Sequence, residues 1–117
     1  MNPFPKEHEL IDVFESEPKI KDNETPFYYN HLEYLLTRDN GSLQCELEPG
    51  IHWARVIWKQ KDETLVDLEL ESIKGIEIEK RNGKEFIHFI FYEGNGIKNL
   101  IVRTKPNFSI SWGTLRE

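Results

Sequence analysis

The chain has 117 residues and a formal net charge of -6, and it is 38% hydrophobic and 31% charged. No apolar run approaches the roughly 20 residues needed to cross a bilayer, and the acidic balance disfavours binding to the phosphates of nucleic acids. The one cysteine excludes an internal disulfide and a cysteine-based zinc site. The first residues also lack the apolar core of a signal peptide. We therefore expect one domain over residues 1–117, located in the cytoplasm.

Residues Pro5 to Ser16 have the pattern of a short amphipathic helix. Proline is well tolerated in the first turn, and apolar residues then recur at helical spacing at Leu10, Val13 and Phe14. Pro18 is the point beyond which the helix cannot continue. We expect the apolar stripe to lie on a sheet, and the polar segment 19–26 to be an irregular linker.

The segment from Phe27 to Glu48 predicts a β-hairpin. Apolar residues alternate along both halves, and Asp39-Asn40-Gly41 supplies the turn between them. Cys45 shares the apolar face of the second half and is expected in the core. After Pro49-Gly50, residues 51–59 read as a third strand that is apolar on both faces and hence central in the sheet.

The stretch from Trp58 to Ile78 predicts strands with one buried and one wet face. Two runs of apolar residues alternate with carboxylates: Val66, Leu68 and Leu70 with Asp67, Glu69 and Glu71, then Ile76 and Ile78 with Glu77 and Glu79. Between the runs, residues 72–75 are compatible with a tight turn or with a bulge, because Gly75 tolerates the backbone angles of both. The pattern does not choose between them.

The rest of the chain continues as strands. Asn82-Gly83 is a strong signal for a two-residue hairpin turn, and residues 86–92 are apolar on both faces. Residues 97–104 and 108–112 predict two more strands. The fold class is therefore α+β and mainly β, with an antiparallel meander of about seven or eight strands and one short N-terminal helix.

Sequence motifs for catalysis or for cofactor binding are absent from the chain. It has no nucleophile elbow, Walker loop, zinc-protease motif or dinucleotide fingerprint. The four histidines are not at ligand spacing, so we expect no metal and no cofactor. His88 reads as a hydrogen-bonded histidine of the core or its rim. We accordingly do not expect an enzyme.

The carboxylates of the 66–79 stretch are the surface feature that calls for explanation. If the two runs pair, Asp67, Glu69 and Glu71 face Glu77 and Glu79, and like charges opposite one another are destabilising. The simpler interpretation is a solvated face on which basic residues of adjacent strands neutralise the carboxylates, with Arg55, Lys98 and Arg103 as candidates.

The alternative interpretation is a docking surface for a positively charged partner, whose binding relieves that repulsion. We then expect the five carboxylates and Trp58 to contact the partner. The further aromatic residues that suit such an interface are Trp53, Trp112, Tyr28 and Tyr29.

The order of these features resembles a family of bacterial immunity proteins encoded beside polymorphic toxins, the immunity protein 50 family. The resemblance rests on Phe14, Pro18, Ile20 and Asp22 in FESEPKIKD, on Arg38 and Gly41 in LLTRDNGSLQCELE, and on Trp58 before TLVDLELESIKGIEIE. It covers roughly residues 10 to 80. Glu17 and Lys21 depart from it, where the family pattern has an aromatic residue and a histidine.

The resemblance implies a cytoplasmic protein that binds and blocks one cognate toxin, without catalytic residues of its own. Two other hypotheses come from the sequence pattern alone. One is a module that binds a small ligand or lipid between helix and sheet. The other is a subunit whose strand edges drive homo-oligomerisation, a homodimer for example.

Overall fold

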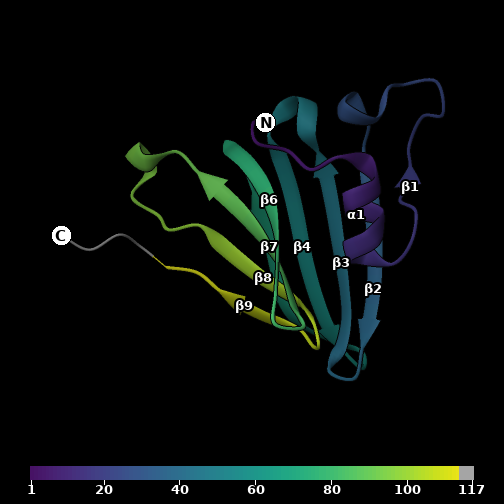
Figure 1. The fold of residues 1–117 in the computed structure, drawn as a ribbon, viewed down its shortest axis with the longest axis vertical. Coiled ribbons are helices and arrows are strands. Elements are labelled where there is room, and N and C mark those ends of the chain that lie inside the picture. The colour runs from purple at the N-terminus through teal and green to yellow at the C-terminus, as the bar shows by residue number, and fades with distance from the viewer. Residues whose placement is uncertain (114–117) are drawn as a thin grey trace.

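The computed structural model describes residues 1–113, and these form two antiparallel sheets and one helix near the N-terminus (Figure 1). The fold class predicted from the sequence, α+β and mainly β, is confirmed. Nine strands are present in residues 1–113, and both sheets have meander order. The sequence predicted about seven or eight strands in one meander. The described residues form nine strands instead, divided between two sheets.

The first sheet, sheet A, has the order β1-β2-β3-β4-β5. Its strands are β1 (Lys19–Ile20), β2 (Leu32–Arg38), β3 (Gly41–Glu48), β4 (Trp53–Gln60) and β5 (Glu63–Leu70). The predicted hairpin is present, but it begins at Leu32, because Phe27–Tyr29 form a 3-10 turn, η1, after Pro26. A second 3-10 turn, η2 (Pro49–Ile51), delays the third strand to Trp53. Strand β4 is central, as predicted, in the sense that it has neighbours on both sides.

The chain passes from sheet A to the second sheet between Leu70 and Ile73. Ser72 has a positive φ of 55°, so the backbone turns there, and a register shift between Ile73 and Gly75 adds a bulge at the start of β6. Residues 72–75 thus combine the two alternatives that the sequence left open. Strand β5 pairs with β4, and β6 pairs with β7, so the two carboxylate runs do not pair with each other.

The second sheet, sheet B, has the order β6-β7-β8-β9. Its strands are β6 (Ile73–Arg81), β7 (Lys84–Phe91), β8 (Leu100–Lys105) and β9 (Ser109–Ser111). The hairpin between β6 and β7 turns at Asn82 and Gly83, with φ of 53° and 77°. Positive φ at both positions is what the sequence predicted for this turn. Strand β7 is buried on one face only, since Phe86, His88 and Ile90 are half-buried on the other.

The core lies between the sheets and helix α1 (Glu7–Phe14), which runs beside sheet A in Figure 1. Leu10, Val13 and Phe14 of the helix are buried, and the Phe14 ring stacks on Tyr34 of β2 with centroids 4.5 Å apart. The helix is shorter than predicted because Glu15 already has left-handed angles. Cys45 is buried, as expected, and its burial raises the pKa of the thiol.

The N-terminal segment lies along strand β6, the edge of sheet B. The backbone N–H of Ile76 donates to the carbonyl of Pro3 over 2.8 Å, and that of Asn2 donates to Lys74 over 2.9 Å. Gly75 permits this approach, because a Cβ there would lie 2.6 Å from the Pro3 carbonyl oxygen. No helix within residues 1–113 combines the length and the apolar character needed to cross a membrane.

Candidate partner-binding surface

The outer face of sheet A is the side of the sheet turned away from helix α1 and the core. Strands alternate their side chains between the two faces, so the register of β2–β5 fixes which residues belong to it. The apolar members are Leu35, Trp53, Ile57 and Leu65, and the charged members are Glu33, Glu46, Glu48, Arg55, Lys59, Asp67 and Glu69. Leu35 is 59% exposed and Leu65 43% exposed. This face therefore offers apolar side chains to a partner among charged ones.

Carboxylates outnumber cations on this face. Arg55 makes two hydrogen bonds to Asp67, from Nε to Oδ1 over 3.0 Å and from Nη2 to Oδ2 over 2.8 Å. The hydrogen bond from Arg55 lowers the pKa of Asp67. Arg55 therefore neutralises the charge of Asp67, as the simpler interpretation predicted for it. Arg103 does not, since its guanidinium donates to Asn107, over 2.6 Å to Oδ1 and 3.1 Å to the carbonyl oxygen.

A cluster of His31, Glu46, Glu48 and Trp53 occupies the end of this face next to η1 and η2. The ring nitrogens of His31 lie 3.1 Å from Glu46 Oε1 and 3.6 Å from Glu48 Oε2. The His31 ring is 5.9 Å from that of Trp53, whose indole N–H donates to Glu69 Oε1 over 3.0 Å. Side chains from β3, β4 and β5 are thereby fixed relative to one another.

The predicted carboxylates lie on two different sheets. Asp67 and Glu69 belong to the outer face of sheet A, and Glu71 is exposed directly after β5. Glu77 and Glu79 lie on the outer face of sheet B, where Glu79 contacts His88 Nε2 over 2.9 Å. The repulsion considered for the case that the two runs pair does not arise, because β5 pairs with β4 and β6 pairs with β7. His88 is hydrogen-bonded and half-buried, as predicted.

Trp58 points the other way from the carboxylates that the sequence grouped with it. It pairs with Leu43 and Val66, which belong to the inner face of sheet A, and its ring lies 6.3 Å from that of Phe108. Its indole N–H donates to the carbonyl of Asn40 over 2.9 Å. Trp58 thus packs at the margin of the core. Trp53 is the tryptophan on the outer face.

Two further exposed residues, Tyr29 and Ile51, lie where η1 and η2 meet beside the His31 cluster. Tyr29 is 71% exposed and Ile51 67% exposed. The Tyr29 ring rests on the backbone of Gly50, where a Cβ would lie 3.0 Å from Tyr29 Cδ1. The sequence pattern predicted strands at both Tyr29 and Ile51. The signals for the 3-10 turns were Pro26, directly before η1, and Pro49, the first residue of η2.

Two other kinds of site were sought in residues 1–113, a metal site and a ligand pocket between helix and sheet. No three of the described His, Cys, Asp and Glu side chains gather closely enough to hold a metal ion. A depression of about 590 Å³ lies between α1 and β6, lined by His8, Glu9, Asp12, Ile78 and Lys80. Asp12 and Lys80 form an ion pair there. Its lining is mostly charged, which does not suit an apolar ligand.

Comparison with known proteins gives a likeness of fold. No protein-family model matches the sequence, and no curated protein matches it. A solved structure does match: a chain of the "Contact-dependent growth inhibition toxin - immunity protein complex from Klebsiella pneumoniae 342", with a TM-score of 0.74. The match covers 96% of both chains at 16% sequence identity. The two chains therefore share a fold over nearly their whole length.

Proposed function

We propose that this chain is a cytoplasmic immunity protein, which binds one cognate bacterial toxin and blocks it without catalysing a reaction. The observation that carries the proposal is the likeness of fold over 96% of both chains to a member of a toxin–immunity protein complex. The resemblance seen in residues 10 to 80 of the sequence points to the same class of protein. Membership of the immunity protein 50 family stays a prediction.

The outer face of sheet A supports this proposal. It is a broad, exposed surface on which Leu35, Leu65 and Trp53 lie among carboxylates. A mixture of apolar and charged side chains is usual for protein interfaces, in which aromatic residues are enriched. We place the contact with the toxin here, with Asp67 and Glu69 among the contacting residues. Glu71 lies at its margin, and Trp58 supports the face from the core side.

The proposal predicts that a toxin is encoded beside this chain, and the experiment that tests it is protection from that toxin. The toxin's C-terminal domain is expressed from an inducible promoter in a laboratory strain, with this chain or an unrelated acidic β-protein of similar size from a second plasmid. We expect growth with this chain and arrest with the unrelated protein. Arrest in both cultures, with this chain soluble and abundant, contradicts the proposal.

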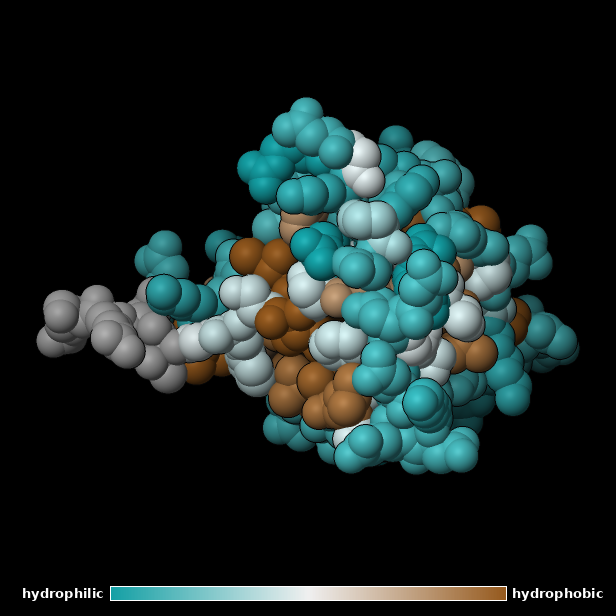
Figure 2. Space-filling model, turned by 90° about the horizontal axis from the view of Figure 1, so that it is seen from below, coloured by the Kyte–Doolittle hydropathy of each residue, from teal (hydrophilic) through white to brown (hydrophobic). Residues whose placement is uncertain are grey.

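A second candidate function is homo-oligomerisation, which one observation favours. Seen from below in Figure 2, hydrophobic side chains gather between hydrophilic regions of the surface. A second copy of the chain would cover such an area. Light scattering at dilutions from about 100 µM to 1 µM distinguishes a stable homodimer from a monomer, since the dimer keeps twice the monomer mass over this range.

A further inference from the structure

We infer that Tyr29 and Ile51 form the anchor by which this chain binds its toxin, and that the toxin presents an apolar socket rimmed by Lys or Arg. We call these two residues the anchor pair. The inference rests on the proposed function and adds to it the position of the contact and the chemistry of the partner. None of the carboxylates singled out from the sequence belongs to the pair.

The exposure of the anchor pair is the first argument. Tyr29 and Ile51 are the two most exposed of the large hydrophobic side chains of residues 1–113, at 71% and 67%. They come from separate turns, and the Tyr29 ring lies against Gly50, the residue directly before Ile51. A few residues, with tryptophan, tyrosine and arginine enriched among them, contribute most of the binding energy at interfaces when a partner removes them from water. Tyr29 is of this kind, and Ile51 adds exposed apolar surface next to Gly50.

The rigidity of the turns is the second argument. Asn30, directly after Tyr29, is only 4% exposed, and its amide donates to the carbonyls of Asp22 and Thr25 over 2.6 and 3.2 Å. On the other turn, His52 follows Ile51, and its Nδ1 lies 2.8 Å from the carbonyl oxygen of Ile73 in sheet B. The backbone that carries the anchor pair is therefore held in place before any partner arrives, which reduces the entropy lost on binding.

Three carboxylates beside the anchor pair indicate the charge of the partner. Glu46 and Glu48 lie next to His31, two residues after Tyr29, and Glu69 bonds to Trp53, two residues after Ile51. Arg55, an arginine of this face, is already engaged by Asp67. A basic protein surface complements these carboxylates, whereas nucleic acid phosphates are repelled by them. We therefore commit to a basic protein partner with an apolar socket.

Alanine variants of the anchor pair test the inference. The probe is the purified C-terminal domain of the toxin encoded beside this chain, and its affinity is measured by biolayer interferometry. Tyr29→Ala and Ile51→Ala are each expected to weaken binding at least about 30-fold, mainly through faster dissociation. Both side chains are exposed, so the melting temperature should change little.

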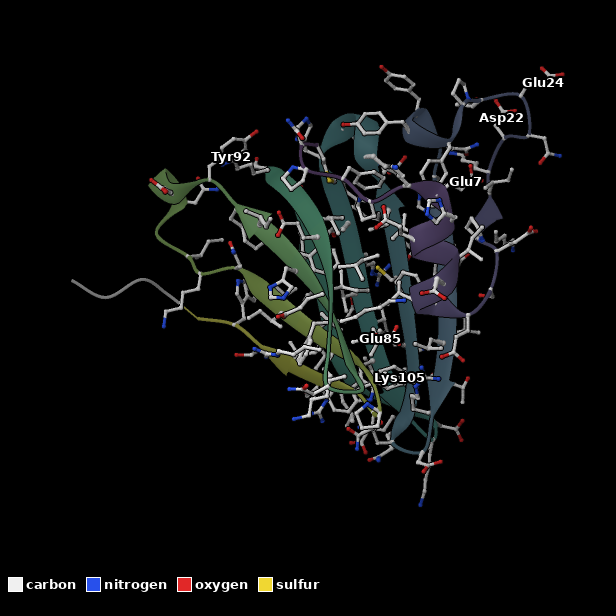
Figure 3. All side chains as sticks on the ribbon, viewed as in Figure 1. Glu7, Asp22, Glu24, Glu85, Tyr92 and Lys105 are labelled. Atoms are coloured by element: carbon white, nitrogen blue, oxygen red, sulfur yellow. The ribbon has the colours of Figure 1, made fainter. Side chains whose placement is uncertain are left out.

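Tyr92→Ala is the matched control. Tyr92 is an aromatic residue of 47% exposure, and Figure 3 shows it on the opposite side of the molecule from Asp22 and Glu24, which belong to the loop before η1. We expect this variant to bind within about twofold of the wild type.

Charge reversal tests the carboxylates separately. Glu48→Lys should slow association with the toxin domain about tenfold at low salt, whereas Glu77→Lys on sheet B should not slow it.

Each outcome decides between the two claims. If the wild type binds and protects but the anchor variants bind equally well, the inference is wrong and the proposed function stands. If the wild type neither binds nor protects, both claims fail. If the anchor variants convert a dimer into a monomer and leave toxin binding unchanged, the pair belongs to a contact between two copies and the inference is overturned.

Discussion

Asn40 and Phe108, 68 residues apart in sequence, are joined by two hydrogen bonds. The Asn40 side-chain amide donates to the Phe108 carbonyl over 2.9 Å, and its Oδ1 accepts from the Phe108 backbone N–H over 3.0 Å. Asn40 lies in the turn between β2 and β3, and Phe108 precedes β9, so these bonds connect sheet A to sheet B. The indole of Trp58 donates to the carbonyl of the same asparagine.

Asn40→Ala is expected to destabilise the protein by about 2 kcal/mol. The change removes both hydrogen bonds and leaves the backbone groups of the buried Phe108 without these partners. Urea unfolding followed by circular dichroism measures the loss as a lower midpoint at unchanged slope. Asn23→Ala, an exposed asparagine in the loop before η1, is the control and should change stability by less than about 0.5 kcal/mol. Equal stability of the two variants would show that the connection contributes nothing.

The Asn40 connection also shows what sequence reasoning could and could not find. Asp39-Asn40-Gly41 and Asn82-Gly83 predict their turns because the backbone angles needed there are local properties of these residues. The partner of Asn40 is set by how the two sheets pack, which is a long-range property. The local pattern likewise identified alternating carboxylates, but not the passage to sheet B after Leu70, which separates them.

The binding surface was predictable only in part, for the same reason. Alternation correctly assigned Asp67 and Glu69 to the exposed side of a strand. It grouped Trp58 with them, although the period of two, applied to β4, places Trp58 and Trp53 on opposite faces. Tyr29 and Ile51 were not found, because the approach of η1 to η2, with Tyr29 beside Gly50, is a long-range property that the local pattern does not contain.

Gly41→Ala is expected to destabilise the protein by about 3 kcal/mol or more. Gly41 has a φ of 125°, and a Cβ there would lie 2.1 Å from the carbonyl oxygen of Lys59, a backbone atom of β4. Strained backbone and a clash within the sheet both oppose the substitution. Gly94→Ala is the matched control, because nothing lies within 4 Å of its added Cβ. A thermal melt compares the two, and a Gly41→Ala variant as stable as Gly94→Ala would refute the clash.

Cys45 is expected to be inert to thiol reagents in the folded protein. Its burial raises the pKa of the thiol, so the reactive thiolate is scarce, and the side chain is inaccessible. Reaction with a chromogenic disulfide reagent should be slow in buffer and fast in urea. Fast reaction in the folded protein would contradict the burial of Cys45.

The raised pKa of the Cys45 thiol also implies that the stability of the protein depends on pH. The unfolded thiol loses its proton near its ordinary pKa of about 8.5, while the folded one keeps it because its pKa is raised. The folded state then binds more protons, so the free energy of unfolding falls as pH rises above 8.5, by up to about 1.4 kcal/mol per pH unit. Cys45→Ala should remove this part of the slope. Parallel pH profiles of variant and wild type would contradict the prediction.

Glu15 is expected to titrate below its ordinary range because of Arg38. Arg38 Nη2 lies 2.5 Å from Glu15 Oε2, and this hydrogen bond lowers the pKa of Glu15. A lowered pKa adds stability above the unfolded pKa, and that stability is lost as pH falls through the folded value. In an NMR titration, Arg38→Gln should return the pKa of Glu15 towards about 4.3, whereas Arg81→Gln should leave it unchanged. An unshifted Glu15 in the wild type would refute the pairing in solution.

The affinity of this chain for the toxin domain encoded beside it tests the central claim most directly. Isothermal titration calorimetry with the two purified proteins should give saturable binding with a Kd below about 100 nM, in the range of specific protein complexes. The Tyr29→Ala variant should bind at least about 30-fold more weakly under the same conditions. Absence of heat and of complex formation at about 10 µM of both proteins would contradict the account.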